Sequence, residues 1–105
     1  MQGSIRSFLN YLEFQRNYSP HTIKNYRRDL LEFDGYLTRD GKERPVDPAK
    51  IDHISIRDFL SHLHQRKNAK SSIARKLAAI RSFYRFLYSQ GEVASNPARL
   101  VRNPR

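Results

Sequence analysis

Two clusters of basic residues carry the side chains of this sequence that are best suited to bind a ligand. Residues 19–28 contain Lys24, Arg27 and Arg28 and no acid. Residues 69–91 also lack acids and contain five cations, which are Lys70, Arg75, Lys76, Arg81 and Arg85. Lysine and arginine both donate hydrogen bonds to phosphate, and arginine does so in a bidentate manner. The two clusters therefore predict binding to a polyanion.

Residue patterns for catalysis or for metal binding are missing from the sequence. The chain has no cysteine, which excludes disulfides and thiolate chemistry. His62 and His64 are two residues apart on an expected helix, so their side chains point to different faces and cannot chelate one ion. Only four glycines are present, and none of them forms a phosphate-binding loop motif. We expect no catalytic residues, no cofactor and no metal.

The composition indicates one small domain with a modest core. The chain has 105 residues, a net charge of +10 and 38% hydrophobic residues. Its longest apolar run, residues 77–80, is too short to span a bilayer, and the first residues do not resemble a signal peptide. We expect a cytoplasmic protein that binds no membrane, and the lack of cysteine fits a reducing compartment.

Apolar residues recur at helical spacing in four segments. The four stripes are Ile5, Phe8, Leu9, Leu12; Ile23, Tyr26, Leu30, Phe33, Leu37; Ile56, Phe59, Leu60, Leu63; and Ile73, Leu77, Ile80, Tyr84, Leu87. The stripes predict an all-α fold, a compact bundle of four main helices. Residues 98–101 have the composition for a short fifth turn of helix.

The expected helix boundaries follow from capping residues. Asn17 ends the first helix, and Ser19 followed by Pro20 begins the second. Ser55 with Asp58 forms a capping box for the third, with Ile54 able to staple to Phe59. The fourth begins at Ser71 or Ser72 and ends at Gln90, before a C-terminal glycine, Gly91. Residues 38–48 are expected to be a loop.

The exposed faces of the second and fourth helices differ from those of self-sufficient helices. Acids are favoured in the first turn of a helix and bases in the last, each worth about 0.3–1 kcal/mol, yet the second helix places its bases in its first half and its acids in its second half. Arg81 and Arg85 form a like-charge i, i+4 pair. The side of the fourth helix opposite its apolar stripe combines small residues with arginines. Its residues are Ser71, Arg75, Ala78, Ala79, Ser82 and Arg85. Small side chains allow close approach to a surface such as the DNA major groove.

Tyr26 and Tyr84 lie on apolar stripes and are expected in the core. Tyr11, Phe14 and Phe86 fall off the stripes. These three aromatic residues indicate contact with a further domain or a neighbouring protomer; alternatively, the buried face of each helix is wider than its stripe.

Two blocks of the sequence resemble a known family. They are YSPHTIKNYRRDLLEFDGYL at residues 18–37 and SSIARKLAAIRSFYRFLYSQGEVASNPA at residues 71–98. Both are similar to the N-terminal, core-binding domain of tyrosine recombinases, the SAM-like domain of phage integrases, and are most similar to the Xer group. The resemblance implies that the second and fourth helices cross the major groove of a recombination half-site. It also implies a separate C-terminal catalytic domain, so that residues 1–95 form the DNA-binding domain and residues 96–105 begin a linker.

This resemblance implies a fragment that is not itself an enzyme, cut from a site-specific recombinase. Its partners would be double-stranded DNA and, in the full-length complex, other recombinase protomers, while the isolated domain would be monomeric. The predicted DNA-binding residues are His21, Thr22, Lys24, Asn25, Arg27, Arg28, Lys70, Ser71, Ser72, Arg75, Lys76, Ala79, Ser82 and Arg85. Thr22 and Ser71 could instead serve as local helix caps.

Two alternatives to DNA binding remain open on the residues alone. The basic faces also suit a helical protein-interaction module for an acidic partner with no specific DNA role. A basic amphipathic membrane binder fits less well, because the apolar faces are needed for the core.

Overall fold

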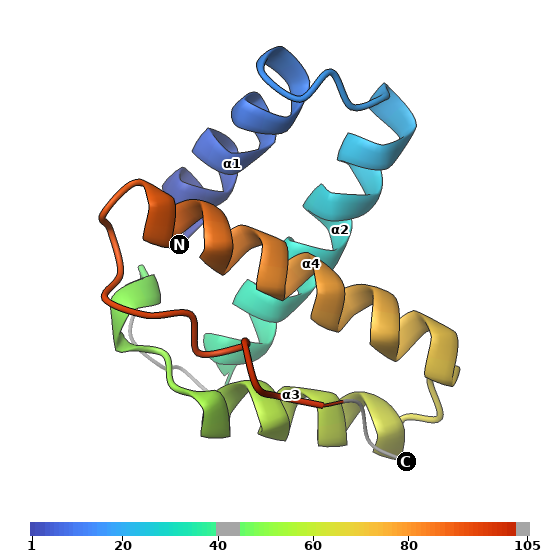
Figure 1. The fold of residues 1–105 in the computed structure, drawn as a ribbon. Helices are drawn as coiled ribbons and strands as arrows, with labels where there is room; N and C mark the ends of the chain where they lie inside the picture. Colours follow the sequence, from blue (N-terminus) through green and yellow to red (C-terminus); the bar gives the residue numbers. More distant parts are fainter. Residues whose placement is uncertain (40–44, 103–105) are drawn as a thin grey trace. The chain divides into compact units, whose positions relative to one another are not determined.

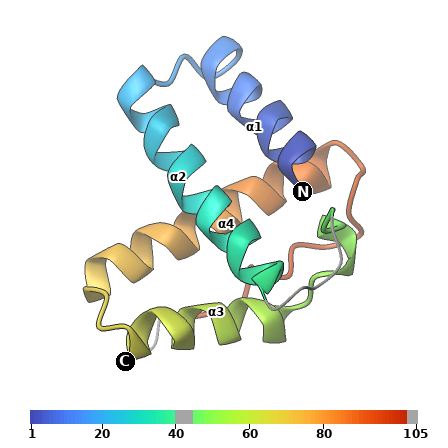
Figure 2. The same ribbon diagram turned by 180° about the vertical axis from the view of Figure 1, so that it is seen from behind.

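The computed structural model describes residues 1–39 and 45–102, and every regular element within them is helical (Figures 1 and 2). The α-helices are α1 (Gln2–Phe14), α2 (Pro20–Leu37), α3 (His53–Gln65) and α4 (Lys70–Ser89), with a short 3-10 helix, η2 (Pro48–Lys50). The predicted all-α fold with four main helices is confirmed. The chain divides into two compact units, Met1–Asp47 and Pro48–Arg105.

The first unit is a hairpin of α1 packed against α2, visible in both ribbon views. The predicted apolar stripe of α1 is confirmed, because all four of its residues are buried. After α1, Asn17 adopts a left-handed conformation with φ 54°, and the N–H of Tyr18 donates to the carbonyl of Leu12 at 3.0 Å. The ring of Tyr26 lies edge-on to that of Phe8, with centroids 5.7 Å apart. The turn thus brings α2 back along α1.

The start of α2 is the one that the sequence predicts. Ser19 is its N-cap and Pro20 its first residue, and the backbone N–H of Thr22 donates to Ser19 Oγ at 3.2 Å. At the other end, the Thr38 hydroxyl donates to the carbonyl of Asp34 at 3.1 Å. Residues 40–44 of the expected loop lie outside the described residues, and its last residue opens the 3-10 helix.

The second unit contains a helix start that sequence reasoning placed wrongly. The N-cap of α3 is Asp52, not Ser55, and its carboxylate accepts the backbone N–H of Ser55 at 3.0 Å. That hydrogen bond lowers the pKa of Asp52 below its usual 3.8. The Asp52 carboxylate thus caps a helix in which Ser55 is already an internal residue. Ile54 is 54% exposed, which is incompatible with the expected apolar staple.

The turn between α3 and α4 is closed by backbone hydrogen bonds. Lys67 is left-handed with φ 61°, and the N–H of Asn68 donates to the carbonyl of Leu63 at 3.1 Å. α4 then begins at Lys70, one or two residues before the expected start, because its N-cap is Ala69 and no side chain caps it. Ser71 therefore does not cap the helix.

The C-terminal end of α4 has the predicted glycine. Gly91 has φ 75°, and the N–H of Glu92 donates to the carbonyl of Leu87 at 3.0 Å. This conformation, with the hydrogen bond across it, satisfies carbonyls that the helix end leaves unpaired. Of the two tyrosines expected in the core, Tyr26 is only half-buried, whereas Tyr84 is fully buried and its hydroxyl donates to the carbonyl of Pro48 at 2.8 Å. That bond fixes η2 to the middle of α4.

After α4 the described chain returns along its own unit as a segment without regular structure, residues 92–102. Ala98 and Val101 are buried within it. Two hydrogen-bonded turns, Arg99 N–H to Asn96 O at 3.1 Å and Val101 N–H to Ala98 O at 3.3 Å, stand where a short fifth helix was expected. The division into a domain ending at residue 95 and a linker from residue 96 stays a prediction, and residues 103–105 lie outside the described part.

The three aromatic residues that fall off the stripes differ in exposure. Phe14 is 72% exposed, whereas Tyr11 and Phe86 are half-buried. The Tyr11 side chain hydrogen-bonds the guanidinium of Arg16, which raises the pKa of Arg16.

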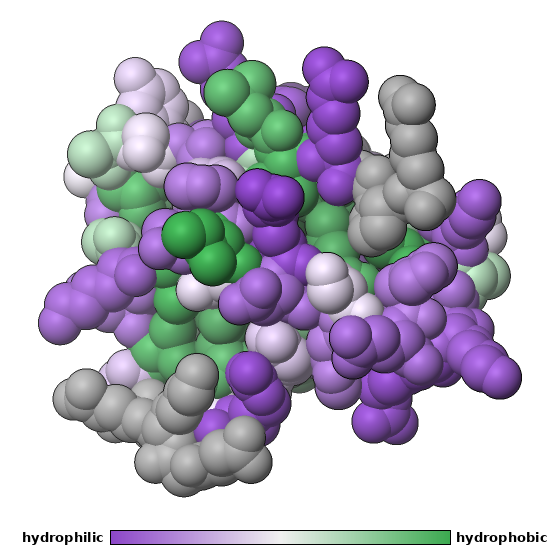
Figure 3. Space-filling model, turned by 90° about the horizontal axis from the view of Figure 1, so that it is seen from below, coloured by the Kyte–Doolittle hydropathy of each residue, from purple (hydrophilic) through white to green (hydrophobic). Residues whose placement is uncertain are grey.

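In the space-filling view of Figure 3, small apolar patches interrupt a largely hydrophilic face. No described helix is both long and apolar enough to cross a membrane.

Candidate nucleic-acid interface

The first turns of α2 expose the predicted basic residues. His21, Lys24, Arg27 and Arg28 are exposed, and the first turn contains no acid. Asn25 is half-buried, with its Nδ2 3.4 Å from His21 Nε2. The N-terminal end of a helix carries a partial positive charge. Lys24, Arg27 and Arg28 make the surface near that end positive. Together with the neighbouring polar side chains they form a surface that we call the α2 face: His21, Lys24, Asn25, Arg27 and Arg28.

Thr22 belongs to the helix cap. Its hydroxyl oxygen accepts a hydrogen bond from the Ser19 hydroxyl at 3.0 Å, and its backbone N–H donates to the same Ser19 oxygen. The capping role left open by the sequence is therefore observed for Thr22. We leave Thr22 out of the α2 face.

The second half of α2 contains three acids, which in a formal charge count cancel the three bases of the first half. Most of these acids are not on the surface. Asp29 and Asp34 are both buried, at 2% and 5% exposure. Asp29 lies beside Arg28, with Oδ1 3.8 Å from Nε. Glu32 is the acid of this half that lies on the surface. The exposed side chains of α2 are therefore mostly basic, and among its cations Arg28 is paired with the buried Asp29.

The outer side of α4 combines small residues with cations. Lys70, Ser71, Arg75, Ala78 and Arg85 are exposed, while Ser72 and Ser82 are half-buried. The helix contains no acid. These residues form a narrow surface with a positive charge near each end. We call it the α4 face: Lys70, Ser71, Ser72, Arg75, Ala78, Ser82 and Arg85.

Two predicted contact residues of α4 lie inside the molecule instead. Ala79 is 4% exposed and Lys76 is 8% exposed, and the ammonium of Lys76 lies 3.4 Å from Asn68 Oδ1. Helical projection wrongly placed Ala79 on the outer side, because the buried arc of α4 also includes Phe83 and is wider than the apolar stripe. Lys76 and Ala79 are therefore excluded from the α4 face.

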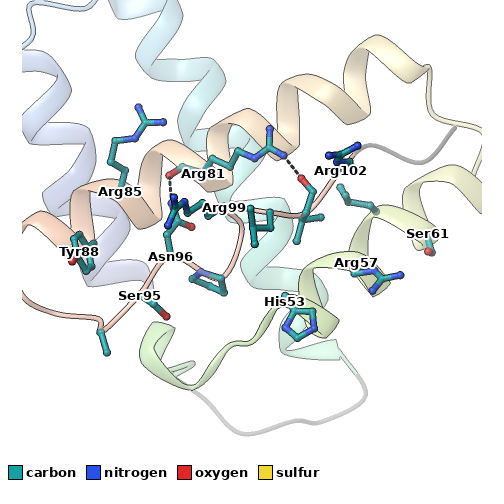
Figure 4. Close-up of a pocket in the computed structure, with 15 residues that line it drawn as sticks. His53, Arg57, Ser61, Arg81, Arg85, Tyr88, Ser95, Asn96, Arg99 and Arg102 are labelled. Atoms are coloured by element: carbon teal, nitrogen blue, oxygen red, sulfur yellow. Dashed lines mark hydrogen bonds between the residues drawn. The ribbon is translucent and has the colours of Figure 1, made fainter.

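Sequence reasoning missed a basic hollow in the second unit (Figure 4). It lies between α3, α4 and the segment 92–102, and five arginines line it: Arg57, Arg81, Arg85, Arg99 and Arg102. No acidic residue from the described chain lines it. The sequence does show that residues 92–105 carry a net positive charge. It does not show that this segment lies beside α3, because contacts between distant parts of the chain cannot be predicted from local residue spacing.

Most of the chain matches one protein family. Residues 5–91 match the family described as phage integrase, N-terminal SAM-like domain. The chain belongs to this family. The integrase N-terminal domain thus covers all four helices apart from the first residues of α1.

Relatives of this integrase domain include tyrosine recombinases. It is 43% identical to Tyrosine recombinase XerC of Pelobacter propionicus, over 100% of this chain and 34% of the relative. It is 40% identical to Tyrosine recombinase XerC of Pelotomaculum thermopropionicum, over 100% of this chain and 35% of the relative. The chain thus spans about a third of the length of the relatives it matches. No solved structure matches it.

The site of this integrase domain consists of hydrogen-bond donors and positive charge. In the described residues, no group of three or more histidines, cysteines, aspartates or glutamates is placed to hold a metal ion. No buried side-chain polar atom among them lacks a hydrogen-bond partner. The α2 face, the α4 face and the basic hollow are therefore chemically suited to bind an anion.

Proposed function

We propose that this chain is the DNA-binding domain of a site-specific tyrosine recombinase and that it grips a recombination half-site through the α2 face and the α4 face. One observation carries the proposal. In a member of the integrase N-terminal family, two helices expose several cations: α4 contains no acid and α2 has none in its first turn, against the preference of a free-standing helix. Phosphates of DNA supply the missing negative charge.

The α4 face has the shape that a major groove accepts. Ser71, Ala78 and Ser82 are small, so the helix backbone can approach base edges closely. Arg75 and Arg85 flank them and can bind phosphate or the O6 and N7 atoms of guanine. The serine hydroxyls can bond either base edges or phosphates. Close approach and flanking charge together fit a helix that enters the groove.

The α2 face has the features of a phosphate-binding helix end. Lys24, Arg27 and Arg28 follow the first turn of the helix, at which free backbone N–H groups and the helix dipole attract anions. His21 and Asn25 add donors that can bond phosphates or base edges. We infer that α2 chiefly positions the domain on the duplex.

In this proposal the domain contributes binding and orientation, and strand cleavage belongs to another part of the recombinase. Other recombinase protomers on the same DNA are its protein partners. The isolated domain is expected to be a monomer that binds duplex DNA without cutting it.

The test is a binding titration of the domain with a labelled duplex of roughly 30 base pairs, about three helical turns, competed by heparin. We expect Lys24→Glu and Arg75→Glu each to weaken duplex binding about tenfold or more, because each places an acid against phosphate. The matched control is Arg6→Glu, which changes an exposed residue of α1 by the same charge. It should reduce affinity by no more than about threefold, through net charge alone.

The salt dependence adds an independent measure. If about five phosphates are neutralised, the slope of log K against log salt is about −4 to −5. Equal weakening by Arg6→Glu and Arg75→Glu would show that only bulk charge matters. Heparin that binds as tightly as duplex, with no preference among duplex sequences, would favour a module for an acidic protein partner.

A further inference from the structure

The basic hollow of the second unit is a binding surface that lies next to the α4 face. Its volume is about 1200 Å³. In Figure 4, His53 and Arg57 extend from α3, Arg81 and Arg85 from α4, and Asn96, Arg99 and Arg102 from the segment between the two helices. Arg85 belongs to both surfaces. The hollow therefore continues the positive charge of the α4 face toward α3.

One of the five arginines builds the hollow and is not available to a ligand. Arg81 Nε donates to the carbonyl of Ala98 at 3.0 Å, and its NH2 group donates to the carbonyl of Val101. Asn96 Nδ2 in turn donates to the carbonyl of Arg81 at 3.2 Å. These bonds hold the segment 92–102 along α4 and form one wall of the hollow. Arg81 is thus a positioning residue.

The other four arginines are exposed and take part in no ion pair within the described residues. They are Arg57, Arg85, Arg99 and Arg102. Like charges gathered in a concave surface raise the local potential and destabilise the free protein. An anion bound in the hollow would reduce this repulsion between the arginines. A chain of phosphates matches it better than a single small anion, because the four guanidiniums come from three separate segments.

We propose that this hollow binds the phosphodiester backbone of DNA beside the stretch that the α4 face contacts. The inference rests on the proposed DNA binding and extends it with a second set of phosphate contacts. Arg85 joins the two sets, since it lies on the α4 face and also lines the hollow. Leu100 and Tyr88, both exposed and both lining the hollow, provide apolar area for the sugars of the backbone.

The experiment compares Arg57→Glu and Arg99→Glu with the matched control Arg6→Glu in the duplex titration. All three residues are exposed, and circular dichroism verifies that each variant keeps its helices. We expect each hollow variant to weaken duplex binding about three- to tenfold at low salt. We also expect each to reduce the magnitude of the salt slope by about 1, because one phosphate contact is lost. Arg6→Glu should leave the slope unchanged.

Three outcomes would overturn the inference. If Arg57→Glu and Arg99→Glu behave like Arg6→Glu while Arg75→Glu still weakens binding, the proposed function stands and the hollow does not bind DNA. If Arg75→Glu is also silent, the proposed function fails with it. If a poly-glutamate peptide binds as tightly as duplex and loses that binding in Arg57→Glu, the hollow is a site for an acidic protein segment.

Discussion

At the scale of single residues, the cations of α4 do not share one role. Lys76 is buried beside Asn68, and Arg81 is occupied by the carbonyls of residues 98 and 101, whereas Arg75 and Arg85 are exposed. The unfavourable pairing of Arg81 with Arg85 is offset because the Arg81 guanidinium donates to backbone carbonyls. Those acceptors lie 17 and 20 residues further along the chain, so helical spacing could not reveal them.

The neighbouring pair Arg75 and Lys76 gives a matched test of this division of roles. Arg75→Met and Lys76→Met each remove one positive charge from adjacent positions of the same helix. We expect Arg75→Met to weaken duplex binding at least about fivefold, since one arginine–phosphate or arginine–base contact is worth about 1–3 kcal/mol. We expect Lys76→Met to change it by less than about twofold, because the buried ammonium does not reach a ligand. Equal losses in a fluorescence anisotropy titration would contradict the assignment.

Arg81 should matter for folding more than its exposed neighbour on the next turn. We expect Arg81→Ala to lower the free energy of unfolding by about 2 kcal/mol, because carbonyls of the segment 92–102 lose a charged donor. Arg85→Ala should change it by no more than about 0.5 kcal/mol. Urea unfolding followed by circular dichroism measures both. An Arg81→Ala domain as stable as Arg85→Ala would show that the carbonyl contacts contribute nothing to stability.

At the scale of elements, the four helices and some of their ends follow from the sequence, whereas α1 ends at Phe14, before the expected Asn17. Ser19 with Pro20 and the glycine at position 91 predict ends that the structure confirms, because each acts through local backbone geometry. The start of α3 was predicted three residues late, since two capping patterns overlap and the carboxylate of Asp52 is the one that caps. The start of α4 has no side-chain cap, so no residue type marked it.

Gly91 offers a clean test of one helix end. Its φ of 75° favours glycine, and a Cβ built there meets nothing within 4 Å. Gly91→Ala should therefore destabilise the domain by about 1 kcal/mol through backbone strain alone. The measurement is the midpoint of urea unfolding. Gly3→Ala, in the first turn of α1 with no positive φ and equally open space, is the control and should not lower the midpoint.

The cap of α3 predicts a dependence of stability on pH. The pKa of Asp52 is lowered in the folded state, so the unfolded chain binds the proton more tightly. Its contribution is complete above its usual pKa of 3.8 and is lost as the pH falls through the folded value. We expect Asp52→Asn, which keeps a capping oxygen, to lose less stability than the parent between about pH 5 and 3. Thermal unfolding across that range checks this, and parallel curves would contradict it.

At the scale of the whole molecule, the net charge of +10 is distributed in a way that the total does not indicate. Two of the three acids in the second half of α2 are buried, and of the α4 cations Lys76 is buried and Arg81 donates to backbone carbonyls. The remaining surface charge concentrates on the α2 face, the α4 face and the basic hollow. Fold class and the α2 face could be predicted because they depend on periodicity and local charge. The hollow could not, because α3 and the segment 92–102 meet only through tertiary packing.

The central claim is that the α2 face and the α4 face bind duplex DNA, and an NMR titration tests it most directly. At 12.4 kDa the ¹⁵N-labelled domain gives resolved amide spectra. On addition of a duplex carrying a recombination half-site, we predict the largest shift changes at residues 21–28 and 70–85. Amides of the exposed side of α1, including Arg6, should change little. Shift changes confined to α1, or spread evenly over all exposed cations, would contradict the claim.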